Sequence, residues 1–270
     1  MSREITAGKE KIVLRLDDVG ASSKEYNQHG KVYWKIFGKP LPVAFFSNWF
    51  FFKRIKPFAN WAVYQELGKD EWTKIFLLLK SRNAKLTVGV TACWALSENE
   101  LVPFNKKFPV VIAILKEGVE EGLIEIANHG LCHCVLKDNL FHPKLFSSNR
   151  IYHREFWEWL PDEVHKNHIE KSQEILTKIF KKDIVTFIPP GNVWTEVTEY
   201  FAKSSGIKYL SSLEDKAPTG IQSNGIIYIG NKKMIDFHDR EISLYGTSWL
   251  EKQMDQHPGE FCTVQDYLKN

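Results

Sequence analysis

The chain has 270 residues, of which 43% are hydrophobic, 26% charged and 13% aromatic. This composition excludes a disordered or low-complexity chain and provides enough apolar surface for a full core. The formal net charge of +3 is too small and too evenly spread to predict a nucleic-acid partner. At about 150 residues per domain the length allows one or two domains, and an α/β barrel of this size forms one.

The first residues, MSREITAGKE, lack the apolar core of a signal peptide, so we expect a cytoplasmic protein. The longest apolar runs, at residues 76–79 and 110–115, are far shorter than the ~20 residues that span a bilayer. We therefore expect no membrane span. Four cysteines in a chain of this size do not indicate a disulfide framework.

The first predicted element is a strand over residues 11–16, which is apolar and β-branched and ends at Asp17, Asp18, Val19 and Gly20. Residues 21–69 form a long aromatic-rich insertion without a sustained period, in which we expect some helix. The next predicted elements, in chain order, are a helix over 70–82 capped by Asp70, a strand over 85–92, a helix over 109–121 and a strand over 123–128.

The second half of the chain continues this alternation. It predicts helices over 161–181 and 195–205 and strands over 184–188, 208–211, 226–229 and 234–237. Strands separated by helices imply right-handed βαβ units, hence a parallel sheet with helices outside, either open or closed into a barrel. In both arrangements functional side chains collect at the carboxyl ends of the strands.

Ligand and acid/base residue types follow several of these strands. His129 and His133 are four residues apart, so on one helical turn both imidazoles converge on a single cation, and Asp18 can complete the set. A divalent metal bound there would lower the pKa of its water and polarise a carbonyl, as amide or ester hydrolysis requires. Taken singly, an Asp-Asp pair is often a turn and a lone His238 is often a core residue.

The ordered set of motifs resembles the polysaccharide deacetylases, the NodB-homology or carbohydrate esterase family four proteins, over about residues 11 to 240. The Asp17-Asp18-Val19-Gly20 segment resembles the family's Asp-Asp-Gly signature, and residues 128–133 resemble its His-x-x-x-His motif. Residues 187–191 resemble its Arg-Pro-Pro turn, and Phe237-His238 resembles its last-strand histidine.

The resemblance implies an α/β fold, a distorted (β/α)7 barrel with parallel strands, here with the long insertion and as a single domain over 1–270. It implies a divalent metal, usually zinc, with cobalt, nickel or manganese as alternatives, bound by Asp18, His129 and His133. It further implies Asp17 as general base and His238 as general acid.

The chain departs from the family pattern at two positions. Ile188 stands where the family has the arginine that holds the catalytic aspartate, and Gly130 replaces a hydroxyl residue. Arg15 lies two residues before Asp17 on the same strand face, so we hypothesise that it supplies the missing cation. Asp236 is placed in the same way relative to His238, and we hypothesise that it hydrogen-bonds the ring.

Four further residues are candidates for substrate binding. Pro190 and Asn192 belong to the turn after a strand, and Arg150 and Trp157 belong to a cationic and aromatic cluster in which rings can stack on sugars. Ordinary turn structure and helix packing are the alternative interpretations.

These observations favour a metal-dependent hydrolase that deacetylates an N-acetylated sugar or glycan precursor, nucleotide- or lipid-linked, with no nucleic-acid partner. The departures keep two alternatives open: a non-catalytic member that binds a saccharide or a metal, and a hydrolase of another amide or ester.

Overall fold

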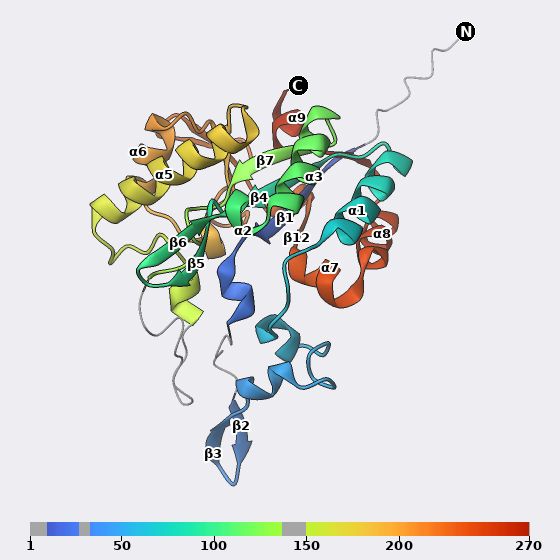
Figure 1. Ribbon diagram of the computed structural model, residues 1–270, viewed down its shortest axis with the longest axis vertical. Coiled ribbons are helices and arrows are strands. Elements are labelled where there is room, and N and C mark those ends of the chain that lie inside the picture. The colour runs from blue at the N-terminus through green and yellow to red at the C-terminus, as the bar shows by residue number, and fades with distance from the viewer. Residues whose placement is uncertain (1–9, 27–32, 137–149, 270) are drawn as a thin grey trace.

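The central sheet has the strand order β10-β11-β9-β8-β7-β4-β1-β12, and β13 pairs with the start of β1. We describe it from a computed structural model covering residues 10–26, 33–136 and 150–269 (Figure 1). The strands are β10 (Gln222–Ser223), β11 (Ile226–Ile229), β9 (Tyr209–Ser211), β8 (Thr186–Phe187), β7 (Ile124–Asn128), β4 (Leu86–Val90), β1 (Lys11–Val19), β12 (Met234–His238) and β13 (Glu260–Cys262).

All neighbouring strands along this order are parallel except β10 and β11. The expected α/β fold with a mostly parallel central sheet is therefore confirmed. The parallel run from β11 to β12 contains seven strands, and no strand pairing joins its two ends within the described residues. The carboxyl ends of these strands lie at one edge of the sheet, where ligand sites of parallel sheets form.

The four helices that the sequence predicts connect parallel strands and lie close to their expected positions: α1 (Lys69–Ser81), α3 (Pro109–Glu120), α5 (Asp162–Phe180) and α6 (Glu196–Ser204). Asp70 is not the cap of α1, as the sequence suggested. The cap position is Gly68, whose backbone N donates to Glu71 Oε2 at 3.0 Å, because the glutamate reaches back over the first turn.

The core lies between the sheet and these helices. Every residue of β4 and β7 is buried, as expected for parallel strands covered on both faces. In α1, Trp72, Ile75 and Leu79 repeat at helical spacing and have no exposed surface. This apolar packing fixes the strands and thereby the positions of the side chains at their carboxyl ends.

The insertion extends beyond the carboxyl ends of the strands (Figure 1). It contains a hairpin of β2 (Tyr33–Ile36) and β3 (Lys39–Pro42), together with the short 3-10 helices η1 (Ser22–Glu25), η2 (Ala44–Asn48) and η3 (Phe58–Trp61). The helix expected in this region is thus of the 3-10 type in its described residues. Many aromatic residues and few good helix formers explain the lack of a longer helix.

Several short elements had no sequence signal. They are the hairpin of β5 (Cys93–Ser97) and β6 (Glu100–Pro103), and the helices α2 (Phe104–Lys107), α7 (Asp239–Tyr245), α8 (Thr247–Gln256) and α9 (Val264–Leu268). Strand β13 was missed too, because three residues give no readable period. Among the described residues no helix has the length and apolar character needed to cross a bilayer.

Candidate metal and catalytic site

Asp17 and Asp18 lie at an irregularity of β1. The register with β4 shifts between Leu16 and Val19, and Asp18 has a φ of 71°. In a regular strand two consecutive side chains point to opposite faces. The bulge turns both carboxylates into one pocket of about 300 Å³. A left-handed aspartate costs about 1 to 3 kcal/mol, and such strain concentrates at functional sites.

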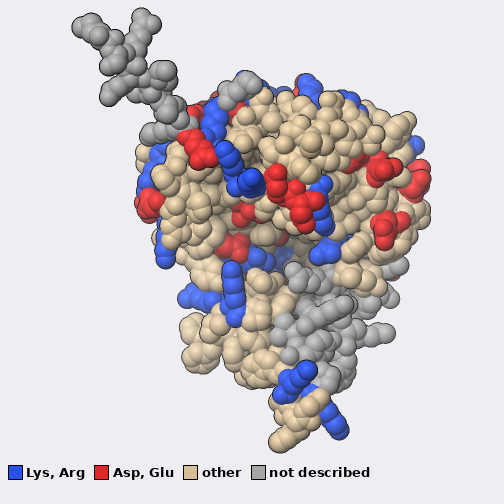
Figure 2. Space-filling model, turned by 180° about the vertical axis from the view of Figure 1, so that it is seen from behind, with Lys and Arg blue, Asp and Glu red and all other residues tan. Residues whose placement is uncertain are grey.

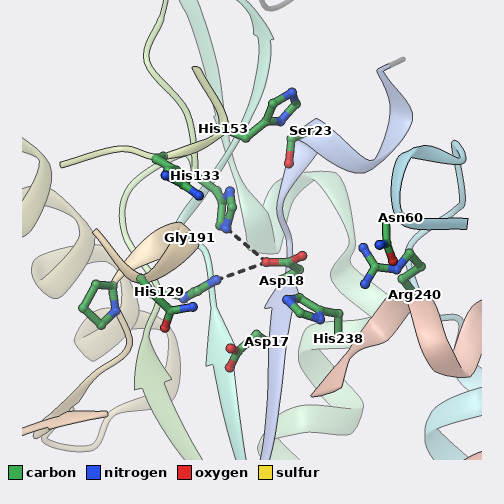
Figure 3. A pocket seen from close by; sticks show the side chains of 13 residues that line it. Asp17, Asp18, Ser23, Asn60, His129, His133, His153, Gly191, His238 and Arg240 are labelled. Carbon is green, nitrogen blue, oxygen red and sulfur yellow. Dashed lines mark hydrogen bonds and ion pairs between the residues drawn. The ribbon is translucent and has the colours of Figure 1, made fainter. Parts of the chain in front are cut away.

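The pocket opens at the carboxyl ends of the parallel strands and is shown in Figure 3. Its lining residues come from β1, β12, the insertion and the loops after β7 and β8: Asp17, Asp18, Ser23, Asn60, His129, His133, His153, Arg154, Pro189, Gly191, Asn192, His238 and Arg240. Sequence reasoning did not assign Ser23, Asn60, His153 or Arg240 to the site. No local motif marks these positions.

His129 and His133 point at Asp18 from two directions (Figure 3). The Nε2 atoms of His129 and His133 lie 3.2 and 3.0 Å from Asp18 Oδ1. His129 Nδ1 lies 2.7 Å from the carbonyl oxygen of Ile188, so Nδ1 donates there and Nε2 keeps its lone pair. The three ligand atoms lie within 4.8 Å of one another. Two imidazole nitrogens and one carboxylate oxygen fit a divalent metal such as zinc.

The two histidines do not share a helical turn, contrary to the sequence interpretation. The chain from His129 to His133 is a loop in which Gly130 and His133 have φ values of 81° and 55°. These left-handed residues reverse the chain and bring the second imidazole beside the first. The same ligands thus converge by loop geometry rather than by helical periodicity.

Glu155 holds this loop in place. Its fully buried carboxylate accepts hydrogen bonds from the backbone N–H groups of Leu131 at 2.9 Å and His133 at 2.8 Å. His168 Nδ1 lies 2.6 Å from Glu155 Oε1, the oxygen that also accepts from Leu131. Burial opposes ionisation of Glu155, but the bonds from His168 and the backbone lower its pKa, so it is a carboxylate.

Glu155 also explains the glycine that follows His129. A Cβ atom at Gly130 would lie 2.2 Å from Glu155 Oε2, so a side chain cannot fit beside this carboxylate. Sequence reasoning missed Glu155 because its partners are 13 to 24 residues away. The only sequence hint was an acidic residue in an aromatic segment.

Arg15 lies where a cation for Asp17 was hypothesised. Its Nη2 donates to Asp17 Oδ2 at 2.9 Å, and its Nη1 donates to Ser211 Oγ at 3.0 Å. The Arg15 side chain is 1% exposed. Asp17 Oδ1 is buried and has no hydrogen-bond partner among the described residues. The buried Ile188 instead packs toward Gly89 of β4.

His238 ends β12 on the same side of Asp18 as Asp17 (Figure 3). Its Nδ1 lies 3.6 Å from Glu241 Oε2, which also accepts the His238 backbone N–H at 2.9 Å. The hypothesised hydrogen bond from Asp236 is not found among the described residues, because Asp236 faces Arg15 at 3.7 Å. Glu241 of α7 is therefore the carboxylate that orients this ring.

The charges of the pocket shift the pKa values of its members. Burial opposes the charge of Asp18, but the imidazoles of His133 and His238 hold its pKa well below the usual value. Partial burial opposes protonation of His238, but Asp18 and Glu241 raise its pKa to about 9. A cation bound at Asp18 would offset part of this negative charge and lower the pKa of His238 again.

The candidate substrate-binding residues do not all lie in the same cavity. Asn192 lines the pocket with a φ of 57°, whereas Pro190 is buried against Gly130 and its neighbour Pro189 lines the pocket instead. Trp157 lines an adjoining cavity of about 550 Å³ that also includes Asn192. The Arg150 side chain lies outside the described part of the structure.

Comparisons with known proteins place this arrangement in a family. The sequence model of the family described as Polysaccharide deacetylase matches residues 62–210, more than half of the chain. This range contains His129, His133 and the Pro-Pro turn, while Asp17, Asp18 and His238 lie outside it. No curated protein sequence matches the chain.

Three solved structures illustrate the similarity. A family 4 carbohydrate-esterase pseudoenzyme from Bacillus anthracis has 11% identity and a TM-score of 0.46, with 74% of this chain and 61% of that chain covered. A family 4 acetyl xylan esterase from Clostridium thermocellum, in complex with a cobalt ion, has 12% identity and a TM-score of 0.45, with 95% and 89% covered.

The third is a family 4 carbohydrate esterase from Bacillus anthracis, with 15% identity and a TM-score of 0.45, and with 75% of this chain and 78% of that chain covered. This chain thus spans less than two thirds of the length of the pseudoenzyme. On the match of the family model, the chain belongs to the polysaccharide deacetylase family.

Proposed function

We propose that this protein is a metal-dependent deacetylase that acts on an N-acetylated sugar or glycan precursor. The observation that carries the proposal is the joint arrangement of two groups in one pocket. The metal-ligand set of Asp18, His129 and His133 lies beside an aspartate with a free buried oxygen and a histidine. Amide hydrolysis needs these parts together.

A divalent cation held by Asp18, His129 and His133 would supply polarisation of the acyl carbonyl and a more acidic water. Asp17 would accept the proton of the attacking water at Oδ1, since Arg15 already occupies Oδ2. His238, oriented by Glu241, would donate a proton to the leaving sugar nitrogen. The charges that develop on the attacking water and on the leaving nitrogen would then be stabilised by side chains that are already in position.

Arg15 and Glu155 support catalysis despite the two departures from the family pattern. Arg15 contacts Asp17 with the charge that Ile188 lacks, and Glu155 fills the space beside Gly130. Arg15 and Glu155 thus lie elsewhere in the sequence than Ile188 and Gly130, the two positions where the family pattern is not kept. This favours an active enzyme over a non-catalytic saccharide-binding member.

The substrate is an N-acetylated sugar that is free, nucleotide-linked or lipid-linked. Arg154 lines the pocket with its guanidinium 5.3 Å from the centre of the Trp157 ring. A guanidinium is suited to phosphate, and an aromatic face to a sugar ring. These two groups support a phosphate-bearing sugar.

Acetate release from a panel of N-acetylated sugars and sugar nucleotides tests the proposal, with protein reconstituted with zinc or cobalt. We expect release that disappears in Asp17→Asn and persists in Asp70→Asn, which changes an exposed aspartate. An Arg15→Met variant with full activity would remove the role proposed for Arg15.

No release from protein that binds one metal per chain would contradict deacetylation. Retained sugar binding in that case would favour the saccharide-binding alternative. Release of a product other than acetate would identify a hydrolase of another amide or ester.

A further inference from the structure

The insertion concentrates exposed hydrophobic side chains. Of the sixteen large hydrophobic residues that are exposed in the described part of the chain, eight lie between residues 34 and 55. They are Trp34, Ile36, Phe37, Leu41, Trp49, Phe50, Phe51 and Ile55, and we call them the aromatic tips. Single exposed apolar residues are ordinary, but such a concentration marks an interaction surface.

The charge of this segment has one sign. Between Glu25 and Glu66 the sequence contains six Lys or Arg residues and no Asp or Glu. Lys35, Lys39 and Arg54 are exposed in the same stretch as the aromatic tips. In Figure 2 the narrow lower end of the molecule shows blue side chains among tan ones and no red.

The hairpin of β2 and β3 presents a phenylalanine at its turn. Phe37 and Gly38 have φ values of 49° and 75°, and the Phe37 side chain is 101% exposed. Two-residue turns of this type favour Asn-Gly because left-handed conformations strain other residues. A fully exposed phenylalanine there benefits neither the turn nor the core, so its role lies in contact with a partner.

The second turn, at residues 49–56, projects from an anchored base. Phe50 and Phe51 are 79% and 77% exposed. Below them, Ser47 Oγ donates to the Trp61 carbonyl at 3.2 Å, and Tyr245 Oη donates to the Arg54 carbonyl at 3.2 Å. These hydrogen bonds fix the backbone that carries the exposed side chains of this turn.

We propose that the aromatic tips and their neighbouring cations dock this protein onto an anionic lipid bilayer. Aromatic side chains favour the interfacial region of a bilayer, and Lys and Arg are attracted to anionic headgroups. Docking requires no membrane span. It is also independent of the proposed deacetylation, and the two are measured separately.

Two other partners fit the surface less well. A second copy of this chain would bring the same cations face to face, which opposes association. Single-stranded nucleic acid is bound in a basic groove with stacking rings, whereas these side chains occupy two projecting turns. A bilayer accommodates projecting side chains because its interface is deformable.

The docking also fixes which way the pocket faces. Asn60 belongs to η3 in the same insertion and lines the pocket with Asp18 and His238. Attachment through residues 34–56 therefore sets the pocket near the lipid surface. If the protein is the proposed deacetylase, this placement favours a lipid-linked N-acetylated sugar as its substrate. This extension rests on the proposed function.

Sedimentation of the full chain with vesicles tests the docking. We expect binding to vesicles of phosphatidylcholine with about 30% phosphatidylglycerol, and much weaker binding to pure phosphatidylcholine. Phe50→Ser combined with Phe51→Ser should weaken binding by roughly ten-fold or more. Leu77→Ser, at an exposed leucine of α1, is the matched control and should bind like the unaltered protein.

Removal of charge gives a second, independent measure. Lys35→Gln and Arg54→Gln should each weaken binding about five-fold, from about 1 kcal/mol per cation at an anionic surface. Lys252→Gln, at an exposed lysine of α8, should leave binding unchanged. Added salt should weaken binding of the unaltered protein as well.

Three results would overturn the proposal. The first is no binding to anionic vesicles, or binding that the Phe50 and Phe51 changes leave intact. The second is a dimer in analytical ultracentrifugation that those changes dissociate, with no vesicle binding. The third is binding to an oligothymidine that those changes abolish, again without vesicle binding.

Discussion

The pocket and the insertion differ in how their charged side chains are arranged. Around the pocket, buried charged groups are paired with groups of opposite sign, as Arg15 is with Asp17 at 2.9 Å. In the insertion, cations and aromatic rings of one stretch are exposed together without an acidic residue between them. Paired buried charges hold a site rigid, whereas exposed charges of one sign remain accessible to a partner.

A second buried cluster shows the first behaviour most clearly. Lys24 of η1 lies 2.7 Å from Glu66 Oε2 and forms an ion pair with Asp239, and its side chain is 1% exposed. Tyr64 Oη donates to Asp239 Oδ1 at 2.8 Å. The cluster joins the segment after β1, the end of the insertion and the start of α7. Since Asp239 follows His238 directly, it also fixes the last-strand histidine.

The largest effect on stability is expected from Lys24→Met. Removing the ammonium leaves two buried carboxylates without a cation, which costs about 3 to 5 kcal/mol of unfolding free energy. Urea unfolding measures the loss, and Lys69→Met, at an exposed lysine, is the control. A loss below about 1 kcal/mol, the range of surface ion pairs, would contradict the role given to this cluster.

Glu155→Gln should have the next largest effect. An amide cannot accept all the hydrogen bonds that the Glu155 carboxylate receives, so we expect a loss of about 1.5 to 3 kcal/mol. Zinc affinity, measured by competition with a chelator, should fall about 10- to 100-fold because the His133 loop is no longer held.

The exposed Glu158 offers a matched control for this change. Glu158→Gln should leave both stability and zinc affinity unchanged. Unchanged zinc affinity in Glu155→Gln would show that this carboxylate does not position the loop.

A smaller effect concerns pH. Burial raises the pKa of Asp239 from 3.8 to about 7, while Lys24 acts in the opposite direction. Between these two values the folded state binds more protons than the unfolded chain, so the free energy of unfolding contributed by this group falls as pH rises through that window. Asp239→Asn should flatten this slope in urea titrations across the window. An unchanged slope would contradict a raised pKa of Asp239 in the folded protein.

The smallest effect is expected in the insertion. Phe50→Ser and Phe51→Ser remove side chains that are mostly exposed, so the free energy of unfolding should change by no more than about 0.5 kcal/mol. Thermal unfolding beside the Leu77→Ser control measures this. A loss above about 2 kcal/mol would mean that these rings pack in the folded protein, and the contrast with the pocket would fail.

Most of the fold follows from the sequence because its long elements have a strong period. Helices α1, α3 and α5 and the parallel strands appear near their expected positions, since apolar spacing and N-terminal signals are local properties. The hairpin of β5 and β6 was missed because its strands have only five and four residues. Strand β13 is also short, and it is held by its pairing with β1 from the other end of the chain. Local pattern carries no information about such pairing.

The sequence by itself determined the residue types of the site and their order on successive strand ends. It could not determine their geometry. The bulge that turns Asp18 beside Asp17 and the non-helical loop that brings His133 to His129 depend on contacts between distant segments. Asp236 is drawn away from His238 by Arg15 of a different strand, and Glu241 contacts His238 because α7 begins directly after β12. Glu155 and Lys24 act through partners 13 to 215 residues away. Hydrogen bonds and ion pairs of that range form only when the sheet brings the segments together, so only the tertiary structure decided them.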